Sequence, residues 1–471
     1  MMLLDQSIHQ ISTLLRQKNL SSVELVTEAY QTIKEINPQI NAFITLVEQN
    51  LALKQARNVD QNRVKFTSPL AGIPYLLKDS YVTQSLRTTA ASAVLQNFIP
   101  PYSATVYHRL EDSGAILIGK MNMDAWGHGG STENTDFKPT KNPYELSRVA
   151  GGSSGGPAAA LACRLAAFAI GEDTGGSIRN PAAWTNTTGL KVTYGRVSRY
   201  GCIAYASSFD TVGPMAKTAA DCALVLKAIA GQDPYDATSA VQPVPDYYQK
   251  LTQSLKGKTI GIPTDLYGDG LDEPIKTAIL KQKKVFQALG LKLVELKMPL
   301  LRYGLAVYYL IGLSETSSNL ARYDGLRFGQ DRHFFTTETM RRIMIGTYAL
   351  SAGYYDAYYR QAQKGRTLLI REYDQAFTHC DVLLMPVNPI SPPKFGELIA
   401  DPLTNIMADI YTVTQNPVGL PSLAVPCGFT PNQLPIGLQL VGQLFAEDLL
   451  LAIGHQYQQV TTWHLQKPQL L

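Results

Sequence analysis

Two glycine-rich stretches decide how this chain is interpreted, "VAGGSSGGPAAA" at residues 149–160 and "GEDTGGSIRN" at residues 171–180. Both place serine next to paired glycines. Glycine permits tight turns and a close approach of the backbone, and serine is a common turn residue, so either stretch alone is about as often a simple loop as a site. The question is whether the two serine clusters carry chemistry together.

The first stretch has the Gly-x-Ser-x-Gly spacing of a hydrolase nucleophile elbow, with Ser153 at its centre. Such an elbow follows a hydrophobic strand, whereas the residues before it, "KNPYELSRVA", are polar and contain Pro143. A phosphate-binding loop is excluded too, because no Gly-Lys-Ser/Thr ending follows and Pro157 stands where the helix should start. None of the histidines lies in a stretch that suggests a catalytic base. A reactive serine in this chain therefore needs a different base.

A lysine can replace histidine as the base for a serine. The Ser-x-x-Lys arrangement occurs at Ser391 and Lys394, but the two residues between them are prolines, which do not fit inside a helix. Lys78 ends the apolar stretch "AGIPYLLKD", and alternation along a strand places it on one face with Pro74 and Leu76. A lysine carried into the interior can act as a base, whereas one that merely ends a strand lies in water, as most lysines do.

Composition indicates a soluble globular protein of the cytoplasm. Of 471 residues, 45% are apolar and 17% are charged, and no stretch approaches the length of about 20 apolar residues that a membrane helix needs. The net charge is +4 with no basic stripe, so we expect RNA contact only through a partner. Five cysteines without a Cys-x-x-Cys pair argue against a disulfide framework and a structural zinc site, and they favour a reducing compartment: Cys163, Cys202, Cys222, Cys380 and Cys427.

Apolar periodicity predicts helices from about residue 4 to 53, one of them capped by Ser21 or Ser22 ahead of Glu24. Strands are predicted in "SPLAGIPYLLKDS", "AILIG", "KTIGIP", "HCDVLLMPVNP", "PSLAVPCGF" and "LPIGLQLVG", and single helices in residues 218–230 and 275–290. Alternating strands and helices favour an α/β fold, and the absence of repeats and long linkers favours one large domain.

Lys78, "GGSSGG" and "DTGGSIRNPA" together resemble the amidase signature family of Ser-Ser-Lys amidohydrolases. The spacing agrees with the family pattern, with 75 positions from Lys78 to Ser153 and 24 from Ser153 to Ser177. The resemblance implies an α/β fold with a large mixed central β-sheet covered by helices on both faces. It also implies a single domain over residues 1–471, with N-terminal helices in 1–65 and the signature core in 66–220.

Longer stretches between residues 36 and 442, among them "ENTDFKPTKNPYELSRVAGGSSGG", "RRIMIGTYALSAGYYDAYY" and "LPIGLQLVG", resemble one family of subunits, the A subunits of glutamyl-tRNA(Gln) amidotransferases. This resemblance implies a glutaminase that supplies ammonia for converting Glu-tRNA(Gln) to Gln-tRNA(Gln), or Asp-tRNA(Asn) to Asn-tRNA(Asn). It implies a heterotrimer in which a B subunit holds ATP, Mg²⁺ and the mischarged tRNA and a C subunit clamps the two. No metal or cofactor is expected in this chain itself.

The resemblance also implies roles for individual residues. Ser177 would attack the glutamine amide, Ser153 would pass on its proton, and Lys78 would be the final base. Ser154 would be structural, and the bond between Gly152 and Ser153 would be cis. The oxyanion would be held by four backbone amides, those of Thr174, Gly175, Gly176 and Ser177.

Glutamine must also be held by its α-carboxylate and α-ammonium groups, which calls for an arginine or tyrosine and for an acid. The matching positions are Tyr308 in "AVYYLIG", Arg342 in "RRIM" and Asp409 in "MADIYT". The adjacent Tyr309 and Arg341 are the alternatives.

The chain departs from the family pattern at Pro157, at Val192 and in "WTNTTG" at residues 184–189, and the segment before "RRIM" is short. None of these changes touches the three triad positions. Two alternatives stay open, a free-standing amidase for another small amide and a non-catalytic scaffold. The scaffold would be expected to have lost a triad residue, whereas all three are present here.

Overall fold

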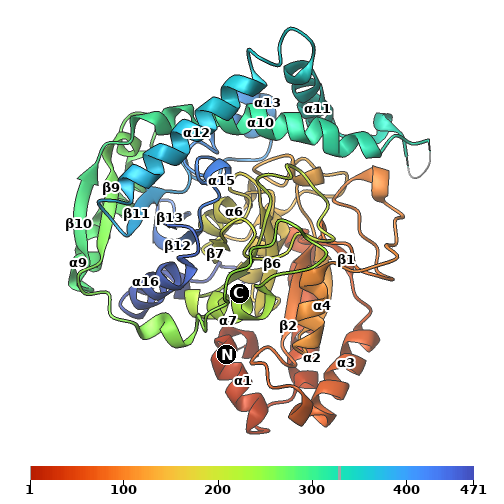
Figure 1. The fold of residues 1–471 in the computed structure, drawn as a ribbon. Coiled ribbons are helices and arrows are strands. Elements are labelled where there is room, and N and C mark those ends of the chain that lie inside the picture. Colours follow the sequence, from red (N-terminus) through yellow and green to blue (C-terminus); the bar gives the residue numbers. More distant parts are fainter. Residues whose placement is uncertain (1, 327–329) are drawn as a thin grey trace.

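The computed structural model describes residues 2–326 and 330–471, and its centre is a mixed sheet of eleven strands (Figure 1). From one edge to the other the strand order is β1-β3-β2-β6-β8-β7-β12-β13-β11-β9-β10. The strands are β1 (Phe43–Leu46), β2 (Pro74–Lys78), β3 (Ile116–Met121), β6 (Phe168–Asp173), β7 (Thr188–Lys191), β8 (Thr211–Ala216), β9 (Thr259–Pro263), β10 (Lys292–Leu296), β11 (Val382–Pro386), β12 (Ser422–Phe429) and β13 (Pro435–Gly442). The two remaining strands, β4 (Lys141–Asn142) and β5 (Glu145–Val149), form a separate hairpin.

Strand β2 lies between β3 and β6 and runs parallel to both. All five of its residues are buried, including Lys78, for which the sequence left burial and exposure open. Because parallel strands end at the same edge of a sheet, the end of β2 and the end of β6 lie together. This arrangement brings Lys78 next to the second glycine-rich stretch, which follows β6 directly.

Helices cover both faces of the sheet. A side chain at Gly437 would meet Ala183 of α6 (Arg179–Trp184), and one at Gly442 would meet Leu450 of α16 (Glu447–Gln459). Gly437 and Gly442 lie on β13 an odd number of residues apart, so they face opposite sides of the sheet. The mixed sheet with helices on both faces is therefore confirmed. Helix α7 (Ala219–Ile229) packs against α16 on the second face.

The N-terminal segment forms three helices at one end of the molecule, α1 (Ile8–Arg16), α2 (Ser22–Ile40) and α3 (Gln49–Gln61) (Figure 1). Ser21 is the cap of α2, in a capping box with Glu24. The Ile8 backbone N–H donates a 2.8 Å hydrogen bond to Asp221 of α7, which joins this segment to the rest of the structure.

Three long helices lie at the opposite end, α10 (Gly304–Asn319), α11 (Thr337–Leu350) and α12 (Tyr359–Ala376) (Figure 1). Gly346 lets α11 approach the backbone of Leu313 on α10, because a side chain there would collide with it. The other α-helices are α4 (Thr105–Asp112), α5 (Gly155–Ala162), α8 (Glu273–Lys281), α9 (Lys283–Ala288), α13 (Glu397–Ala400), α14 (Pro402–Met407) and α15 (Gln415–Val418).

Two elements differ from the sequence-based expectation. The single helix expected at residues 275–290 is divided into α8 and α9 at Gln282, whose side chain donates a 3.1 Å hydrogen bond to the backbone of β12 at Cys427. Residues 211–216, which were not among the predicted strands, form strand β8 between β6 and β7. Gly213 and Pro214 are poor strand formers, and pairing with strands on both sides overrides that local preference.

Candidate active site

Lys78 and Ser153 form the centre of the site. The Lys78 side chain is 0% exposed, so the sheet carries it into the interior rather than into water. Its Nζ lies 2.8 Å from Ser153 Oγ and donates a 3.3 Å hydrogen bond to the Glu172 backbone carbonyl. The contact joins two residues that are 75 positions apart.

The first glycine-serine stretch is a turn that leads into α5. The Gly152–Ser153 peptide bond is cis, as the family resemblance implied, and Ser153 O accepts a 3.2 Å hydrogen bond from Asp124 N. Pro157 lies in the first turn of α5, where a missing N–H is tolerated. The preceding strand β5 pairs with β4 outside the central sheet, which excludes a nucleophile elbow on a core strand.

The two glycine-serine stretches meet directly. Ser154 N donates a 3.1 Å hydrogen bond to the backbone carbonyl of Ser177, and Ser154 Oγ donates one of 3.3 Å to Glu172 O. Both contacts fix the backbone, which agrees with a structural role for Ser154. Ser177 is 8% exposed and Ser153 is 1% exposed, so Ser177 lies nearer the surface of the site.

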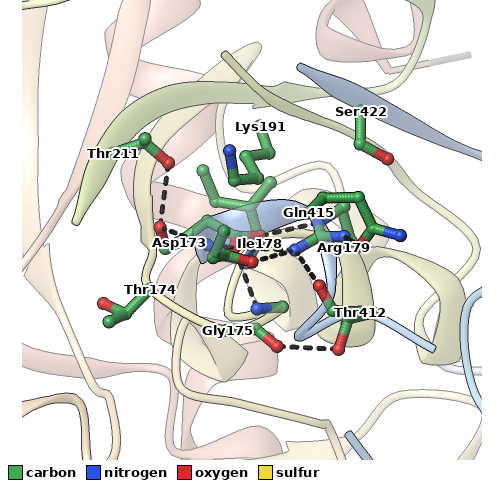
Figure 2. A network of polar contacts seen from close by, with 12 residues as sticks. Asp173, Thr174, Gly175, Ile178, Arg179, Lys191, Thr211, Thr412, Gln415 and Ser422 are labelled. Carbon is green, nitrogen blue, oxygen red and sulfur yellow. Dashed lines mark hydrogen bonds and ion pairs between the residues drawn. The ribbon is translucent and has the colours of Figure 1, made fainter. Parts of the chain in front are cut away.

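Asp173 holds the loop that carries Ser177 (Figure 2). Its carboxylate accepts hydrogen bonds from Gly176 N at 2.8 Å and Ile178 N at 3.1 Å, and it pairs with Arg179 at 3.0 Å. Burial would raise the pKa of Asp173, but the charge and hydrogen bonds of Arg179, with the charge of Lys191, lower it well below its usual value. The Asp173 carboxylate therefore stays charged at the base of the loop.

The contacts of Asp173 leave fewer backbone amides that could bind an oxyanion. The N–H of Gly176 already donates to Asp173, so it is not free to bind an oxyanion in this structure. The backbone amides of Thr174, Gly175 and Ser177 remain as the candidates. Gly175 O in turn accepts a 2.7 Å hydrogen bond from the Thr412 hydroxyl (Figure 2).

Arg342 points into the protein from α11, whereas Arg341 points outward. The Arg342 side chain is 6% exposed and the Arg341 side chain is 40% exposed. Arg342 donates hydrogen bonds to the Tyr205 hydroxyl at 2.9 Å and to Glu338 at 2.7 Å. The structure thus favours Arg342 over its neighbour as a binding residue.

Tyr308 contacts the loop that carries Ser177, and Asp409 contacts the neighbouring Tyr309. A side chain at Gly175 would come within 2.4 Å of the Tyr308 hydroxyl, so Tyr308 packs against the loop that carries Ser177. Tyr309 donates a 2.9 Å hydrogen bond to Asp409. Burial raises the pKa of Asp409 to about 7, although the Tyr309 hydrogen bond and the charge of Arg342 oppose this shift.

Three residues that the structure places at the site were not predicted from the sequence: Glu172, Tyr205 and Asp124. Glu172 Oε2 lies 3.5 Å from Lys78 Nζ. Its only sequence signal is an acidic residue at the end of a buried strand. Tyr205 contacts Arg342 from a loop in which the sequence showed no motif. Asp124 braces the turn at Ser153 by donating its backbone N–H to Ser153 O at 3.2 Å.

Three further findings concern the cysteines, metal binding and membrane-spanning helices. All five cysteines are free thiols. Within residues 2–326 and 330–471, no group of three or more histidine, cysteine or acidic side chains is placed to hold a metal ion. In the same part of the chain, no helix is both long and apolar enough to cross a membrane.

Comparison with known proteins places this geometry in a family. Residues 24–451 match the family described as Amidase. The chain is 47% identical to the A subunit of glutamyl-tRNA(Gln) amidotransferase from Microcystis aeruginosa, over 98% of this chain and 99% of that protein. It is also 47% identical to the same protein from Geobacillus kaustophilus, over 100% of both chains.

Solved structures of similar proteins superpose on nearly the whole of this chain. The crystal structure of the A subunit of glutamyl-tRNA(Gln) amidotransferase from Thermotoga maritima superposes with a TM-score of 0.84 at 35% identity, covering 98% of this chain and 95% of that one. The structure of 6-aminohexanoate cyclic dimer hydrolase gives a TM-score of 0.89 at 25% identity, with 99% of both chains covered. This chain belongs to the amidase family, and the relatives that match it at 47% identity over their full length are A subunits of glutamyl-tRNA(Gln) amidotransferases.

Proposed function

We propose that this chain is the glutamine-hydrolysing A subunit of a tRNA-dependent amidotransferase, with Lys78, Ser153 and Ser177 as its catalytic triad. The observation that carries the proposal is the buried 2.8 Å contact between Lys78 Nζ and Ser153 Oγ, beside the loop of Ser177. Full-length identity of 47% to A subunits supports glutamine as the substrate.

In the proposed reaction Ser177 Oγ attacks the side-chain carbonyl carbon of glutamine. The proton of Ser177 passes to Ser153 Oγ, and the proton of Ser153 passes to Lys78 Nζ, because a serine needs a base to become a strong nucleophile. The amides of Thr174, Gly175 and Ser177 stabilise the oxyanion. The proton then returns through Ser153 to the leaving nitrogen, and ammonia departs. Water hydrolyses the γ-glutamyl ester on Ser177, which releases glutamate and restores the serine.

Tyr308, Arg342 and Asp409 are proposed to hold the substrate. Arg342 and Tyr308 would bind the α-carboxylate, and Asp409 would bind the α-ammonium group. A guanidinium suits a carboxylate because it offers two parallel donors. Tyr205 and Tyr309 would orient these groups through the hydrogen bonds to Arg342 and Asp409.

The ammonia is proposed to be used by a partner subunit for the amidation of tRNA-bound glutamate or aspartate. A B subunit would bind ATP, Mg²⁺ and the mischarged tRNA, and a C subunit would complete a heterotrimer in the cytoplasm. The acceptor would be Glu-tRNA(Gln), and also Asp-tRNA(Asn) where that species is mischarged. Residues 1–471 are proposed to act as a single amidase domain, with helices in 1–65 packed on the signature core of 66–220.

The test is to purify the chain with its B and C subunits and to measure glutamate release and tRNA amidation. We expect glutamine hydrolysis that depends on the partner subunits and on charged tRNA, and its loss in Ser177→Ala. Unchanged glutamine-dependent amidation in Ser177→Ala would disprove the catalytic assignment and favour a scaffold.

A second candidate is a free-standing amidase, favoured by the structural similarity to 6-aminohexanoate cyclic dimer hydrolase. It predicts that the chain alone hydrolyses a small amide at a full rate. A glutaminase rate that appears only with the B subunit would exclude it.

A further inference from the structure

The carboxylate of Glu172 lies beside Lys78, the last residue of the proposed triad. It is the residue before the last of β6, and its side chain is 2% exposed. Its Oε2 lies 3.5 Å from Lys78 Nζ, which is itself 2.8 Å from Ser153 Oγ. The other carboxylate oxygen, Oε1, is buried and has no hydrogen-bond partner in the described part of the chain. Within those residues, Lys78 is the one basic side chain that lies within ion-pair distance of Glu172.

The groups around Glu172 do not supply another positive contact. Tyr81 donates its hydroxyl to Gly171 O at 2.7 Å, and its pKa is well above its usual value because of burial and then nearby negative charges. The pKa of the Cys202 thiol is also well above its usual value, first because of burial and then because of Glu172 and Asp210. Both side chains are therefore neutral around neutral pH.

Asp210 is a second buried acid near Glu172, and the negative charge of Glu172 affects its pKa. Burial and then the charge of Glu172 raise the pKa of Asp210 to about 7, although the charge of Arg199 opposes this shift. Asp210 is already used by other donors, since it accepts hydrogen bonds from Tyr205 N and from the Thr174 hydroxyl. Asp210 therefore braces the loop, and Glu172 remains the acid that contacts the lysine.

A buried carboxylate without donors is costly unless an opposite charge compensates it. Lys78 becomes positively charged when it receives the proton of Ser153. An ammonium in a dry interior is equally costly by itself. The two costs offset each other when the ammonium forms next to Glu172, at the moment of proton transfer.

We propose that Glu172 is a positioning residue of the triad, which stabilises the Lys78 ammonium as it forms and so extends the relay to Ser177, Ser153, Lys78 and Glu172. The proton balance of the reaction is unchanged. Lys78 gains one proton through Ser153 during attack and returns it to the leaving nitrogen, and the Glu172 carboxylate neutralises the charge in between. The inference rests on the proposed Ser-Ser-Lys mechanism, but it does not depend on which amide is hydrolysed.

The experiment replaces Glu172 by glutamine, Glu172→Gln, which keeps the size and removes the charge. kcat/KM for glutamine hydrolysis is measured against pH in the complete complex, since this profile reports groups of the free enzyme. We expect the plateau to fall by about tenfold or more. We also expect the acid limb to move to lower pH, because the variant removes a negative charge that favours a positive charge beside it.

Glu447→Gln is the matched control. Glu447 is also buried, has one oxygen without a hydrogen-bond partner and lies 3.7 Å from a cation, Arg196, but it belongs to α16. The Glu447→Gln variant should leave the acid limb of the kcat/KM profile at the same pH. A Glu172→Gln profile with an unmoved acid limb would overturn the proposal, whatever its plateau.

Two further variants, Glu172→Ser and Ser177→Ala, distinguish a failure of the inference about Glu172 from a failure of the proposed function. Should Glu172→Gln not fold, Glu172→Ser is measured in the same way and carries the same expectation, because it also removes the charge. Full activity in Ser177→Ala would defeat the proposed function itself. Loss of activity in Ser177→Ala together with unmoved limbs in both Glu172 variants would defeat only the inference about Glu172.

Discussion

The guanidinium of Arg342 donates a 2.9 Å hydrogen bond to the hydroxyl of Tyr205, a residue 137 positions earlier in the chain. The contact fixes an arginine on α11 against the loop that precedes β8, next to Tyr308 and Tyr309 of α10. Its partner on the other side is Glu338, one turn earlier on α11. The arginine is thereby held in one orientation before any substrate arrives.

The first prediction concerns Arg342→Lys. A lysine cannot donate to Tyr205, Glu338 and a carboxylate in the same fork geometry. KM for glutamine should rise by about tenfold to a hundredfold, as expected when hydrogen bonds to a charged group are lost, with a smaller change in kcat. Steady-state glutaminase assays measure both constants. Arg341→Lys, at an exposed neighbour, should change neither; an equal effect of the two variants would contradict the assignment.

The second prediction separates the two adjacent serines. Ser153→Ala should lower kcat by about 10³-fold or more, because it removes the hydroxyl that is proposed to pass the proton of Ser177 to Lys78. Ser154→Ala should lower kcat far less and should instead lower thermal stability, by about 0.5–1.5 kcal/mol for a lost hydrogen bond. Activity assays and thermal unfolding distinguish the two. The assignment is wrong if Ser154→Ala is the inactive variant.

The third prediction concerns pH. Burial raises the pKa of Asp409 to about 7, so this carboxyl becomes neutral as the pH falls through 7. A neutral acid cannot pair with the α-ammonium group, and KM should therefore rise below about pH 7. Tyr309→Phe removes a hydrogen bond that lowers this pKa, so the rise in KM should begin at higher pH.

Asp409→Asn provides the control for that profile. Its KM should be high at every pH and should show no transition near neutrality, because the amide does not titrate there. A transition that persists in Asp409→Asn would assign it to another group.

The fourth prediction concerns stability. Asp173→Asn leaves Arg179 buried without its counter-charge, which typically costs about 3–5 kcal/mol. The folded-state pKa of Asp173 is lowered, so its contribution is present above the unfolded pKa of about 3.9 and is lost as pH falls below it. Unfolding midpoints of the variant should therefore approach those of the parent chain in acid. Asp356→Asn, in an exposed pair with Arg360, should leave the midpoint unchanged.

The fifth prediction tests the close packing at Gly175. Gly175→Ala would place a methyl group 2.4 Å from the Tyr308 hydroxyl, and Tyr308 is buried and has little room to move. We expect a fall in kcat/KM of tenfold or more, since small displacements at a catalytic loop have about this effect or a larger one. Gly312→Ala, whose methyl group would lie 3.8 Å from Phe209, should retain activity.

Much of the site could be predicted from the sequence because its signals are local. The apolar stretch "AGIPYLLKD" predicted a strand that ends at Lys78. The family resemblance, carried by the two glycine-serine stretches and their spacing, implied the roles of Ser153 and Ser177. The cap at Ser21 follows from a similar short-range pattern. Strand β8 was missed because Gly213 and Pro214 weaken the local signal, and only pairing with β6 and β7 reveals it.

The sequence by itself predicted the alternation of strands and helices, since periodicity is a property of neighbouring residues. Its resemblance to the amidase signature family implied the triad of Lys78, Ser153 and Ser177. Only the tertiary structure decided that Arg342 is buried and Arg341 is exposed, that the N–H of Gly176 donates to Asp173, and that Glu172 lies beside Lys78. The last contact joins residues of two parallel strands that are distant in the chain. Its distance depends on how β2 and β6 pair in the sheet, and no local pattern contains that information.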